Sequence, residues 1–369
     1  MGNKKRITFF LDALHGGGAE KAVVNLLKGF AERNEFDLDL VLATKKGPYL
    51  DLVPKQVRIV DLKAGRAVMA TLSLVNYLKQ NRPWVLIGNM GHVNVVAFMA
   101  RELARIDTRL VLVEQNTMSA SQSQLKRAKL VDLLMKWFYP RADAVAGVSA
   151  GVARDLERQL GLGTETVKVL NNPVVNEDLI TLSQADFDHP WFTANTPTPP
   201  VFLAVGRLNP QKDFPNLLTA FAQVRKQTKA RLLILGEGSE REKLETMIDK
   251  LGIKEHVLLP GFVKNPYAYM KRASCLVLSS REEGLPTVLI EAMACGCPVV
   301  ATNCPSGPDE ILDRGIYGPL VPIEDSTALA EAMVKILENP PKTELLVQRA
   351  NEYSTEKVIA TYLSLLHHL

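Results

Sequence analysis

Short apolar runs alternate with helix-compatible segments along the chain, and this rhythm restricts the fold more than any other feature. The candidate strands of the first half are "ITFFLDAL", "DLDLVLAT", "WVLIGNM", "RLVLVEQN", "DAVAGVS" and "TVKVLNN". Helix-compatible segments such as "AEKAVVNLLKGFAERN" separate them. Buried parallel strands joined by crossover helices have this pattern. Residues 1–173 are therefore predicted to form one doubly wound α/β domain.

The rhythm stops once and restarts, which divides the chain. Residues 174–200 end in the Thr-Pro run "NTPTPP" and are predicted to be a linker. In residues 201–350, "PVFLAVGRL", "ARLLILGEG", "HVLLPGF", "SCLVLSS" and "CPVVATN" alternate with helical segments, so a second α/β domain is expected. A helix within 351–369, "YSTEKVIATYLSLL", could end the second domain or cross back to the first.

The distribution of charged and apolar residues restricts the kinds of binding partner and of cellular location that are expected. Residues 1–172 carry 25 Lys and Arg against 16 Asp and Glu, hence +9, and the remainder carries 19 against 24, hence −5. The first half therefore favours an anionic partner. No apolar run reaches the roughly 18 residues of a membrane span. The four cysteines, all between residues 275 and 304, lack metal-site spacing and are interpreted as reduced thiols of a cytosolic protein.

Candidate ligand groups follow predicted strands, where open α/β sheets bind ligands; with two domains, this edge would line a cleft. The first strand is followed by "HGGGAEK", whose Gly17 and Gly18 precede a helix. Glycines there let a ligand approach the backbone and the positive helix start. Lys21 breaks the dinucleotide fingerprint G-x-G-x-x-G, and a tight structural turn explains the glycines equally well.

Two cations follow the first strand of the second domain, in "GRLNPQKDF". Arg207 and Lys212 lie five positions apart across a turn, so both can converge on one anion. The alternative is a pair of solvated surface cations.

Two glutamates bracket the apolar stretch in "REEGLPTVLIEAMACGC". Gly284 and Pro286 break the backbone after Glu283, and a helix starting near Thr287 would place Glu291 about one turn further on. The helix start would offer free N–H groups to an anion, with a carboxylate on each side to accept hydroxyls. A glycosidase-like acid and nucleophile pair is the rival interpretation. It is disfavoured if the bound anion is a leaving group, because such a group needs charge stabilisation more than protonation.

Weaker candidates follow other strands. His92 in "IGNMGHVN" is a candidate for the reaction centre, with a structural loop or core histidine as the alternative. The stretch "LPGFVKN" could read a flat base edge through its backbone. Glu114, Gln115 and Asn116 are candidates for acceptor contact, and Ser239 in "LGEGSEREKL" is a candidate helix cap.

Together these stretches, with "SSREEGLPTVLIEAMACGCPVVATNCPSGPDEIL" and "GPLVP", resemble the retaining nucleotide-sugar glycosyltransferases of family 4. The resemblance covers nearly all of the second domain; in the first domain it rests on the glycine loop and the general rhythm. It implies the GT-B fold, in which two Rossmann-like α/β domains face each other across a cleft. In that family a carboxylate pair with seven residues between is a signature, which here is Glu283 and Glu291.

The resemblance implies a role for each matching residue. Glu283 would hold hydroxyls of the transferred sugar and Glu291 those of the ribose. Arg207 and Lys212 would neutralise the diphosphate. The implied catalytic residues are Glu283, Arg207, Lys212 and His92. The implied donor-binding residues are Gly17, Gly18, Arg207, Lys212, Gly261, Val263, Glu283, Gly284, Leu285, Pro286, Thr287, Val288 and Glu291.

The activity that the resemblance implies is retaining transfer of a hexose or N-acetylhexosamine from a nucleotide-diphosphate sugar, with UDP by family habit, to a saccharide acceptor that is expected to be lipid-linked. No metal or other cofactor and no nucleic acid is expected. The alternatives are a soluble small-molecule or protein acceptor, or a non-transferase sugar-nucleotide enzyme of the same fold. The sequence leaves the base, sugar and acceptor open.

Residues 121–141 form a predicted amphipathic helix. On a helical projection Lys126, Lys129 and Lys136 share one arc, and the opposite half is apolar and interrupted by Arg127. The apolar half comprises Leu130, Val131, Leu134, Trp137 and Phe138. Such a helix can lie on an anionic membrane or pack into a core with a solvated face. The first interpretation predicts a cytoplasmic protein at the inner face of a membrane, acting on a polyprenyl-diphosphate-linked saccharide.

Overall fold

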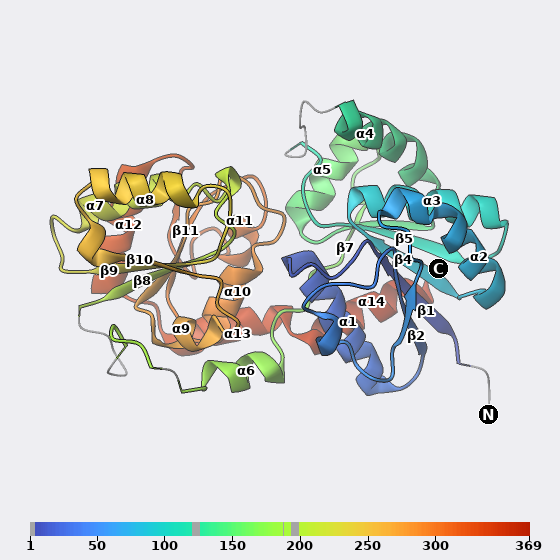
Figure 1. Cartoon of the computed structure of the whole chain (residues 1–369), viewed down its shortest axis with the longest axis horizontal. Coiled ribbons are helices and arrows are strands. Elements are labelled where there is room, and N and C mark those ends of the chain that lie inside the picture. Colours follow the sequence, from blue (N-terminus) through green and yellow to red (C-terminus); the bar gives the residue numbers. More distant parts are fainter. Residues whose placement is uncertain (1–3, 120–125, 187, 193–198) are drawn as a thin grey trace. The chain divides into compact units, whose positions relative to one another are not determined.

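The computed structural model of the chain describes residues 4–119, 126–186, 188–192 and 199–369 (Figure 1). It consists of two compact units. Unit 1 comprises Met1–Val174 and Thr355–Leu369, and unit 2 comprises Val175–Ser354. Each unit contains one parallel sheet with helices on both faces, as the alternating sequence pattern predicts.

The sheet of unit 1 has seven strands in the order β3-β2-β1-β4-β5-β6-β7. Residues Arg6–Leu11 of β1 pair in parallel with Asp37–Leu42 of β2, in the register Arg6 opposite Asp37. The strands are β1 (Arg6–Leu11), β2 (Asp37–Leu42), β3 (Arg58–Asp61), β4 (Val85–Asn89), β5 (Arg109–Glu114), β6 (Ala144–Gly147) and β7 (Lys168–Val169). The central strands are buried almost throughout, which explains their continuous apolar sequence.

Local sequence signals start and end the helices of unit 1. The helices are α1 (Gly18–Arg33), α2 (Thr71–Asn81), α3 (Gly91–Ala104), α4 (Lys126–Phe138), α5 (Ala150–Leu160) and α14 (Thr355–His367). Ser149 caps α5, because its Oγ accepts a hydrogen bond from the N–H of Val152 at 3.2 Å. Gly161 ends the same helix in the left-handed conformation with φ 68°.

The last helix of the chain packs on the first, within unit 1. Tyr362 of α14 meets Phe30 of α1 edge to face, with ring centroids 6.3 Å apart. Gly29 lies at this contact, where a Cβ would stand 2.6 Å from the Thr355 methyl and 2.7 Å from Ile359 Cγ1. Of the two positions left open for the C-terminal helix, the structure has the one in the first unit, beginning at Thr355 rather than at residue 351.

The sheet of unit 2 has six strands in the order β10-β9-β8-β11-β12-β13. They are β8 (Val201–Val205), β9 (Arg231–Leu235), β10 (Val257–Gly261), β11 (Cys275–Leu278), β12 (Val299–Thr302) and β13 (Leu320–Val321). The helices are α6 (Glu177–Ser183), α7 (Phe214–Val224), α8 (Arg241–Lys250), α9 (Tyr267–Arg272), α10 (Thr287–Ala294), α11 (Pro308–Ile311), α12 (Ser326–Glu338) and α13 (Thr343–Ala350). Side chains of β8, β9, α7 and α12, including Phe202 and Phe221, form one core cluster.

The expected linker, residues 174–200, is not wholly irregular. It contains α6 and, from Val175 on, belongs to unit 2. Asn176 caps α6 by accepting the N–H of Leu179 at 2.9 Å, and Leu179 is buried. The helix packs against α9, and Asn265 donates to the Leu182 carbonyl at 2.8 Å. This helix of seven residues has only two buried positions, too few to show a helical period, so the sequence pattern missed it.

Two short edge strands, β3 and β13, also lay outside the candidate strands. They are only four and two residues long, and apart from the buried Val321 their side chains are at most partly buried, so they carry little of the apolar signal that marks the central strands. The expected cap at Ser239 is wrong, because α8 begins at Arg241 after Glu240 and has no side-chain cap. The backbone of Glu240 instead donates to the Leu208 carbonyl at 3.0 Å.

Candidate active site

The loops after β8 and β11 meet where the strand order of unit 2 reverses. Such a reversal is where open α/β sheets form ligand sites. The backbone N–H of Arg281 donates to the Gln211 carbonyl at 2.9 Å, and Gln211 Nε2 donates to the Glu282 carbonyl at 2.9 Å. Ser279 Oγ donates to the Lys212 carbonyl at 2.7 Å. The two predicted motifs, "GRLNPQKDF" and "REEGLP", are therefore brought side by side by the sheet.

A short ion pair joins these loops. Lys212 Nζ lies 2.5 Å from Glu283 Oε1, with the two side chains 18% and 8% exposed. Ser280 Oγ donates to the same carboxylate oxygen at 2.6 Å. The aliphatic stem of Lys212 runs over Gly206, where an added Cβ would be 3.2 Å from Cε. The ammonium is thus held in place and is no freely solvated surface cation.

Arg207 differs from Lys212 in its surroundings. Its residue is exposed, and its guanidinium makes no ion pair or hydrogen bond within the described part of the chain. The loop that carries it is nevertheless fixed, because Leu208 donates to the Glu237 carbonyl at 2.9 Å. Gly236 and Gly238 permit this approach, since a Cβ on them would lie 1.9 Å from the Gly206 oxygen and 2.3 Å from the Leu208 oxygen. Arg207 therefore projects from a rigid loop with its charge available.

The stretch after Glu283 turns into α10 at Thr287, as the sequence predicts. Gly284, Leu285 and Pro286 are buried ahead of it, and Val288 is 9% exposed. The first N–H groups of a helix have no acceptor within it, and no side chain caps this one. These groups and the helix dipole favour an anion at Thr287 and Val288.

Glu291 follows one helical turn after Thr287. It is 7% exposed, and Tyr267 of α9 donates its hydroxyl to Oε1 at 3.3 Å. Glu283 and Glu291 are therefore both buried carboxylates flanking one helix start. Neither glutamate lies on a solvated face.

A further candidate loop follows β10. Gly261 ends that strand with φ 92°, and its carbonyl accepts the N–H of Gly236 at 2.9 Å. Val263 is half-buried, whereas Phe262 between them is 69% exposed. An exposed aromatic ring beside a fixed backbone is suited to stacking on a flat ligand. Nothing in the sequence pattern distinguished Phe262 from a buried strand residue.

The unit 1 candidates follow neighbouring strands of their own sheet. Gly17 is the N-cap of α1 and Gly18 its first residue, directly after β1. His92 is the second residue of α3, after β4, and is exposed rather than a core histidine. Strands β1 and β4 pair at the point where the order of this sheet reverses. Both glycines and the histidine thus occupy the ligand edge of unit 1.

Glu114 and Gln115 are not surface groups ready to touch an acceptor, since they are 6% and 8% exposed. Asn94 Nδ2 donates to Glu114 Oε1 at 2.7 Å, and the Tyr139 hydroxyl donates to the same oxygen. Burial raises the pKa of Glu114 to about 7. Asn172 Nδ2 donates to Gln115 Oε1 at 2.9 Å. Of the three acceptor candidates, only Asn116 is exposed.

The cysteines are buried and unreactive in character. All four are free thiols, and burial raises the pKa of Cys295 and of Cys304 to about 12. Among the described residues no group of His, Cys, Asp and Glu could hold a metal ion.

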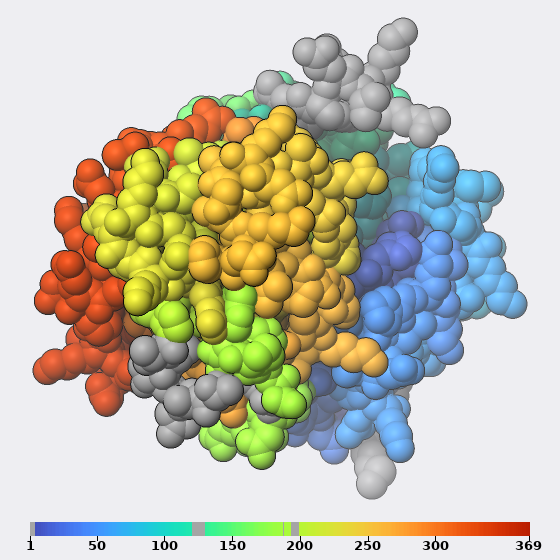
Figure 2. All heavy atoms as spheres, turned by 60° about the vertical axis from the view of Figure 1, so that its left-hand side comes forward, coloured from blue at the N-terminus to red at the C-terminus, as the bar shows by residue number. Residues whose placement is uncertain are grey.

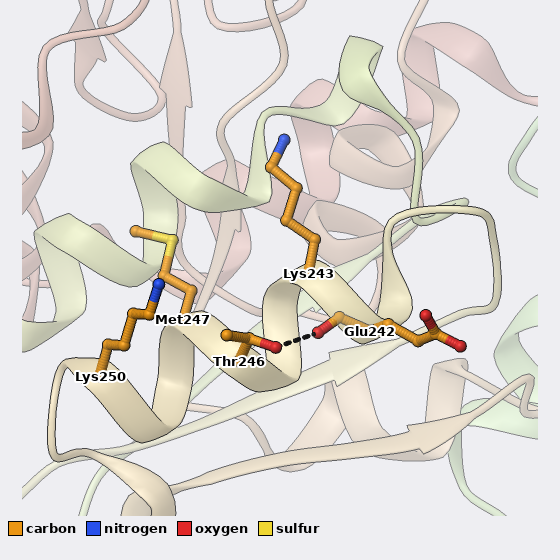
Figure 3. Close-up of a pocket in the computed structure, with 5 residues that line it drawn as sticks. All are labelled: Glu242, Lys243, Thr246, Met247 and Lys250. Carbon is orange, nitrogen blue, oxygen red and sulfur yellow. Dashed lines mark hydrogen bonds between the residues drawn. The ribbon is translucent and has the colours of Figure 1, made fainter.

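Figure 3 shows a hollow on α8 that contains none of the predicted site residues. It is lined by Glu242, Lys243, Thr246, Met247 and Lys250. In the space-filling view, residues coloured yellow and orange cover the central part of the near surface of unit 2, beside green and red ones (Figure 2). The Thr246 hydroxyl donates to the Glu242 carbonyl at 2.9 Å within the helix, so this hollow is ordinary helix surface.

Solved structures share the fold. The Anabaena protein HepE, in complex with UDP and glucose, superposes with a TM-score of 0.79 and 21% identity, over 99% of this chain and 100% of that chain. The architecture is the GT-B fold of glycosyltransferases. The expected fold class is confirmed.

The chain belongs to glycosyltransferase family 4. The family model "Glycosyltransferase Family 4" matches residues 16–177, and the model "Glycosyl transferases group 1" matches residues 187–353. The family membership expected from the motifs is therefore confirmed, and the chain is a glycosyltransferase.

Two curated relatives align over most of their length. One, 28% identical over 91% of both chains, is the N-acetylgalactosamine-N,N'-diacetylbacillosaminyl-diphospho-undecaprenol 4-alpha-N-acetylgalactosaminyltransferase of Campylobacter jejuni. The other, 27% identical over 85% of both chains, is an amylovoran biosynthesis glycosyltransferase of Erwinia amylovora.

Proposed function

We propose that this glycosyltransferase moves a hexose or N-acetylhexosamine from a UDP-sugar to a lipid-linked saccharide, with retention of anomeric configuration. The observation that carries the donor part is the meeting of Lys212, Glu283 and the start of α10 at one sheet edge. A cation, a carboxylate and free N–H groups there match the three chemical parts of a sugar diphosphate.

The diphosphate would bind between Lys212, Arg207 and the N–H groups of Thr287 and Val288. Lys212 already bonds Glu283 in the free protein, so its ammonium would share its three donors between that carboxylate and a phosphate oxygen. Arg207 has no competing anion among the described residues. Two cations and a helix start supply the positive charge that the departing diphosphate needs, and we expect transfer to continue in EDTA.

The carboxylates would orient the two sugars of the donor. Glu283, beside Lys212, would accept hydroxyls of the transferred sugar, and Glu291, a turn into α10, those of the ribose. The base would lie against the loop after β10, with the backbone of Gly261 and Val263 reading its edge and Phe262 stacking on its face. The UDP found in the HepE structure supports uridine as the base.

Retention would follow from displacement on one face of the sugar. The bond from the anomeric carbon to the phosphate oxygen breaks, and a bond from that carbon to the acceptor oxygen forms on the same side. The acceptor proton passes to the departing phosphate oxygen, which makes a protein base unnecessary. His92, exposed after β4, would contact the donor sugar or the reacting centre.

The relative from Campylobacter jejuni is named for a saccharide carried on diphospho-undecaprenol, which supports a lipid-linked acceptor. The +9 charge of residues 1–172 agrees with an acceptor that carries a diphosphate. The donor and the acceptor would then both be anionic.

Helix α4 is the candidate for contact with the membrane that holds such an acceptor. Leu130, Leu133 and Trp137 are 56%, 56% and 63% exposed and lie along one stripe. Phe138, expected on the apolar half, instead stacks on Phe98 at 4.5 Å. The part of the chain whose side chains are described does not include Lys126, Arg127 and Lys129. Within the described residues, no helix is long and apolar enough to cross a bilayer.

A flotation assay tests the membrane part. The chain should float with vesicles containing anionic lipid at low salt, and a Leu130→Ser/Trp137→Ser variant should float less, because both apolar anchors are lost. Equal recovery with neutral and anionic vesicles, or no flotation at low salt, would refute it.

Binding and transfer test the donor part. UDP-sugars, including UDP-N-acetylgalactosamine and UDP-glucose, are screened by thermal shift, and transfer is then followed with the one that binds. Lys212→Ala and Glu291→Ala should keep the thermal transition of the free chain yet lower turnover by about 100-fold or more. Lys243→Ala, in the α8 hollow, is the matched control and should retain full turnover. Undiminished turnover in both site variants would contradict the assignment.

A further inference from the structure

Four buried hydroxyls surround the loop that carries Glu283. Their side chains belong to Ser279, Ser280, Thr302 and Ser306, which are 2%, 0%, 0% and 3% exposed. Three of them donate to backbone carbonyls: Ser279 to Lys212 at 2.7 Å, Thr302 to Ser280 at 2.6 Å and Ser306 to Gly284 at 2.9 Å. These bonds fix the path of the loop.

Ser280 differs from the other three, because its hydroxyl donates to the Glu283 carboxylate itself, at 2.6 Å. It shares Oε1 with Lys212 Nζ, which lies 2.5 Å away. Among the described residues Oε2 accepts no hydrogen bond. Two donors from different loops therefore occupy one oxygen and leave the other open to a ligand.

Binding of a sugar nucleotide would affect the two hydrogen bonds to Glu283, from Lys212 and from Ser280, differently. Lys212 carries a charge that a diphosphate attracts, so its bond to Glu283 would weaken if a nucleotide diphosphate bound there. Ser280 is neutral and fully buried, so it stays on Oε1. Its own carbonyl is held by Thr302, which limits movement of the hydroxyl.

We propose that Ser280 is a positioning residue that presents Glu283 Oε2 to the hydroxyls of the transferred sugar. The inference rests on the proposed function, in which Glu283 contacts that sugar. Ser280 would act through the glutamate and would touch neither the nucleotide nor the sugar. Its loss should therefore weaken recognition of the sugar while recognition of the nucleotide diphosphate persists.

The test compares UDP with the UDP-sugar identified by the screen. In Ser280→Ala, the Kd for UDP should stay within about twofold of the unaltered chain, whereas the Kd for the UDP-sugar rises and kcat falls, each by about tenfold. Ser183→Ala is the matched control, because Ser183 is also buried in unit 2 and donates to the Ile180 carbonyl at 2.7 Å. Both affinities should be unchanged in that variant.

A double-mutant cycle with Glu283→Gln separates positioning from general packing. If Ser280 acts through the glutamate, Ser280→Ala should change UDP-sugar affinity less than about twofold in the Glu283→Gln background. A full tenfold loss in that background, or equal losses for UDP and UDP-sugar, would overturn the proposal. Ser280→Cys has a similar side-chain volume but a weaker hydrogen-bond donor. Its loss of UDP-sugar affinity should therefore be measurable but smaller than the loss expected for Ser280→Ala. This variant serves as the test if Ser280→Ala does not fold.

The outcomes distinguish this proposal from the proposed function. An unaltered chain that binds no UDP-sugar would defeat the proposed function. A chain that binds and transfers normally but is indifferent to Ser280→Ala and Ser280→Cys would defeat the positioning role alone.

Discussion

Glu114 shows how burial changes a single residue. Asn94 and Tyr139 both donate to its Oε1, and the side chain lies behind the ligand edge of unit 1. The sequence placed Glu114 after a strand but could not tell an exposed carboxylate from a buried one. That difference depends on α3 and the residues after α4, which cover it.

A pH-dependent stability follows from the same residue. Its pKa is about 7 when folded, against 4.5 as the ordinary value. Between these values the folded chain keeps a proton that the unfolded chain has released, so the free energy of unfolding falls as the pH rises from 4.5 to 7. Glu114→Gln can still accept both hydrogen bonds without ionising. As the pH rises from 4.5 to 7, the free energy of unfolding of Glu114→Gln should increase by about 3 kcal/mol relative to that of the unaltered chain.

Urea denaturation at several pH values measures this gain. Glu32→Gln, at an exposed position of α1, serves as the control and should follow the unaltered chain at every pH. Parallel curves for Glu114→Gln and the unaltered chain would contradict the raised pKa.

At the scale of elements, boundaries marked by backbone-breaking residues were predictable. Gly284 and Pro286 predicted the start of α10, and the helix begins at Thr287. Ser239 did not announce the start of α8, since the Leu208 carbonyl takes the N–H of Glu240 and the helix starts at Arg241. A tertiary hydrogen bond there replaces the local capping signal.

The contact of α1 with α14 gives a prediction at this scale. Helix propensity alone predicts that Gly29→Ala stabilises α1 by about 1 kcal/mol. The added Cβ would instead collide with Thr355 and Ile359 of α14, so we expect a net loss of about 1–3 kcal/mol in thermal or urea unfolding.

A relief variant checks the cause. In a chain that already carries Thr355→Ser and Ile359→Ala, the atoms that clash are gone, and Gly29→Ala should cost less. Strictly additive costs, or a stabilising Gly29→Ala in the unaltered chain, would show that the helices do not meet at this glycine.

For the whole molecule, α14 joins the last residues of the chain to the unit that holds the first. Its buried side chains are Val358, Ile359, Tyr362, Leu363 and Leu366. Each buried side chain of this size contributes about 1.5–3 kcal/mol. Ending the chain at Ser354 should therefore lower the unfolding temperature of unit 1 strongly, while residues 175–354 keep their own transition.

Calorimetry and hydrogen exchange, read separately for the two units, measure this effect. Ending the chain after Leu366 removes only three residues beyond the buried face and should leave both transitions unchanged. Equal loss of protection in both units after truncation at Ser354 would contradict the assignment of α14 to unit 1.

The sequence by itself determined the two parallel-sheet units and which loops carry the candidate donor motifs, because buried strands and helix starts leave local patterns of apolar, glycine and proline residues. Only the tertiary structure decided which residues meet. Lys212 and Ser280 both bind Glu283 Oε1, Glu114 is buried, and α14 packs in unit 1. The sequence of an amphipathic helix, or the charge of a side chain, indicates the type of group that it will contact. Which distant residue meets that need depends on how the strands are ordered in the sheet.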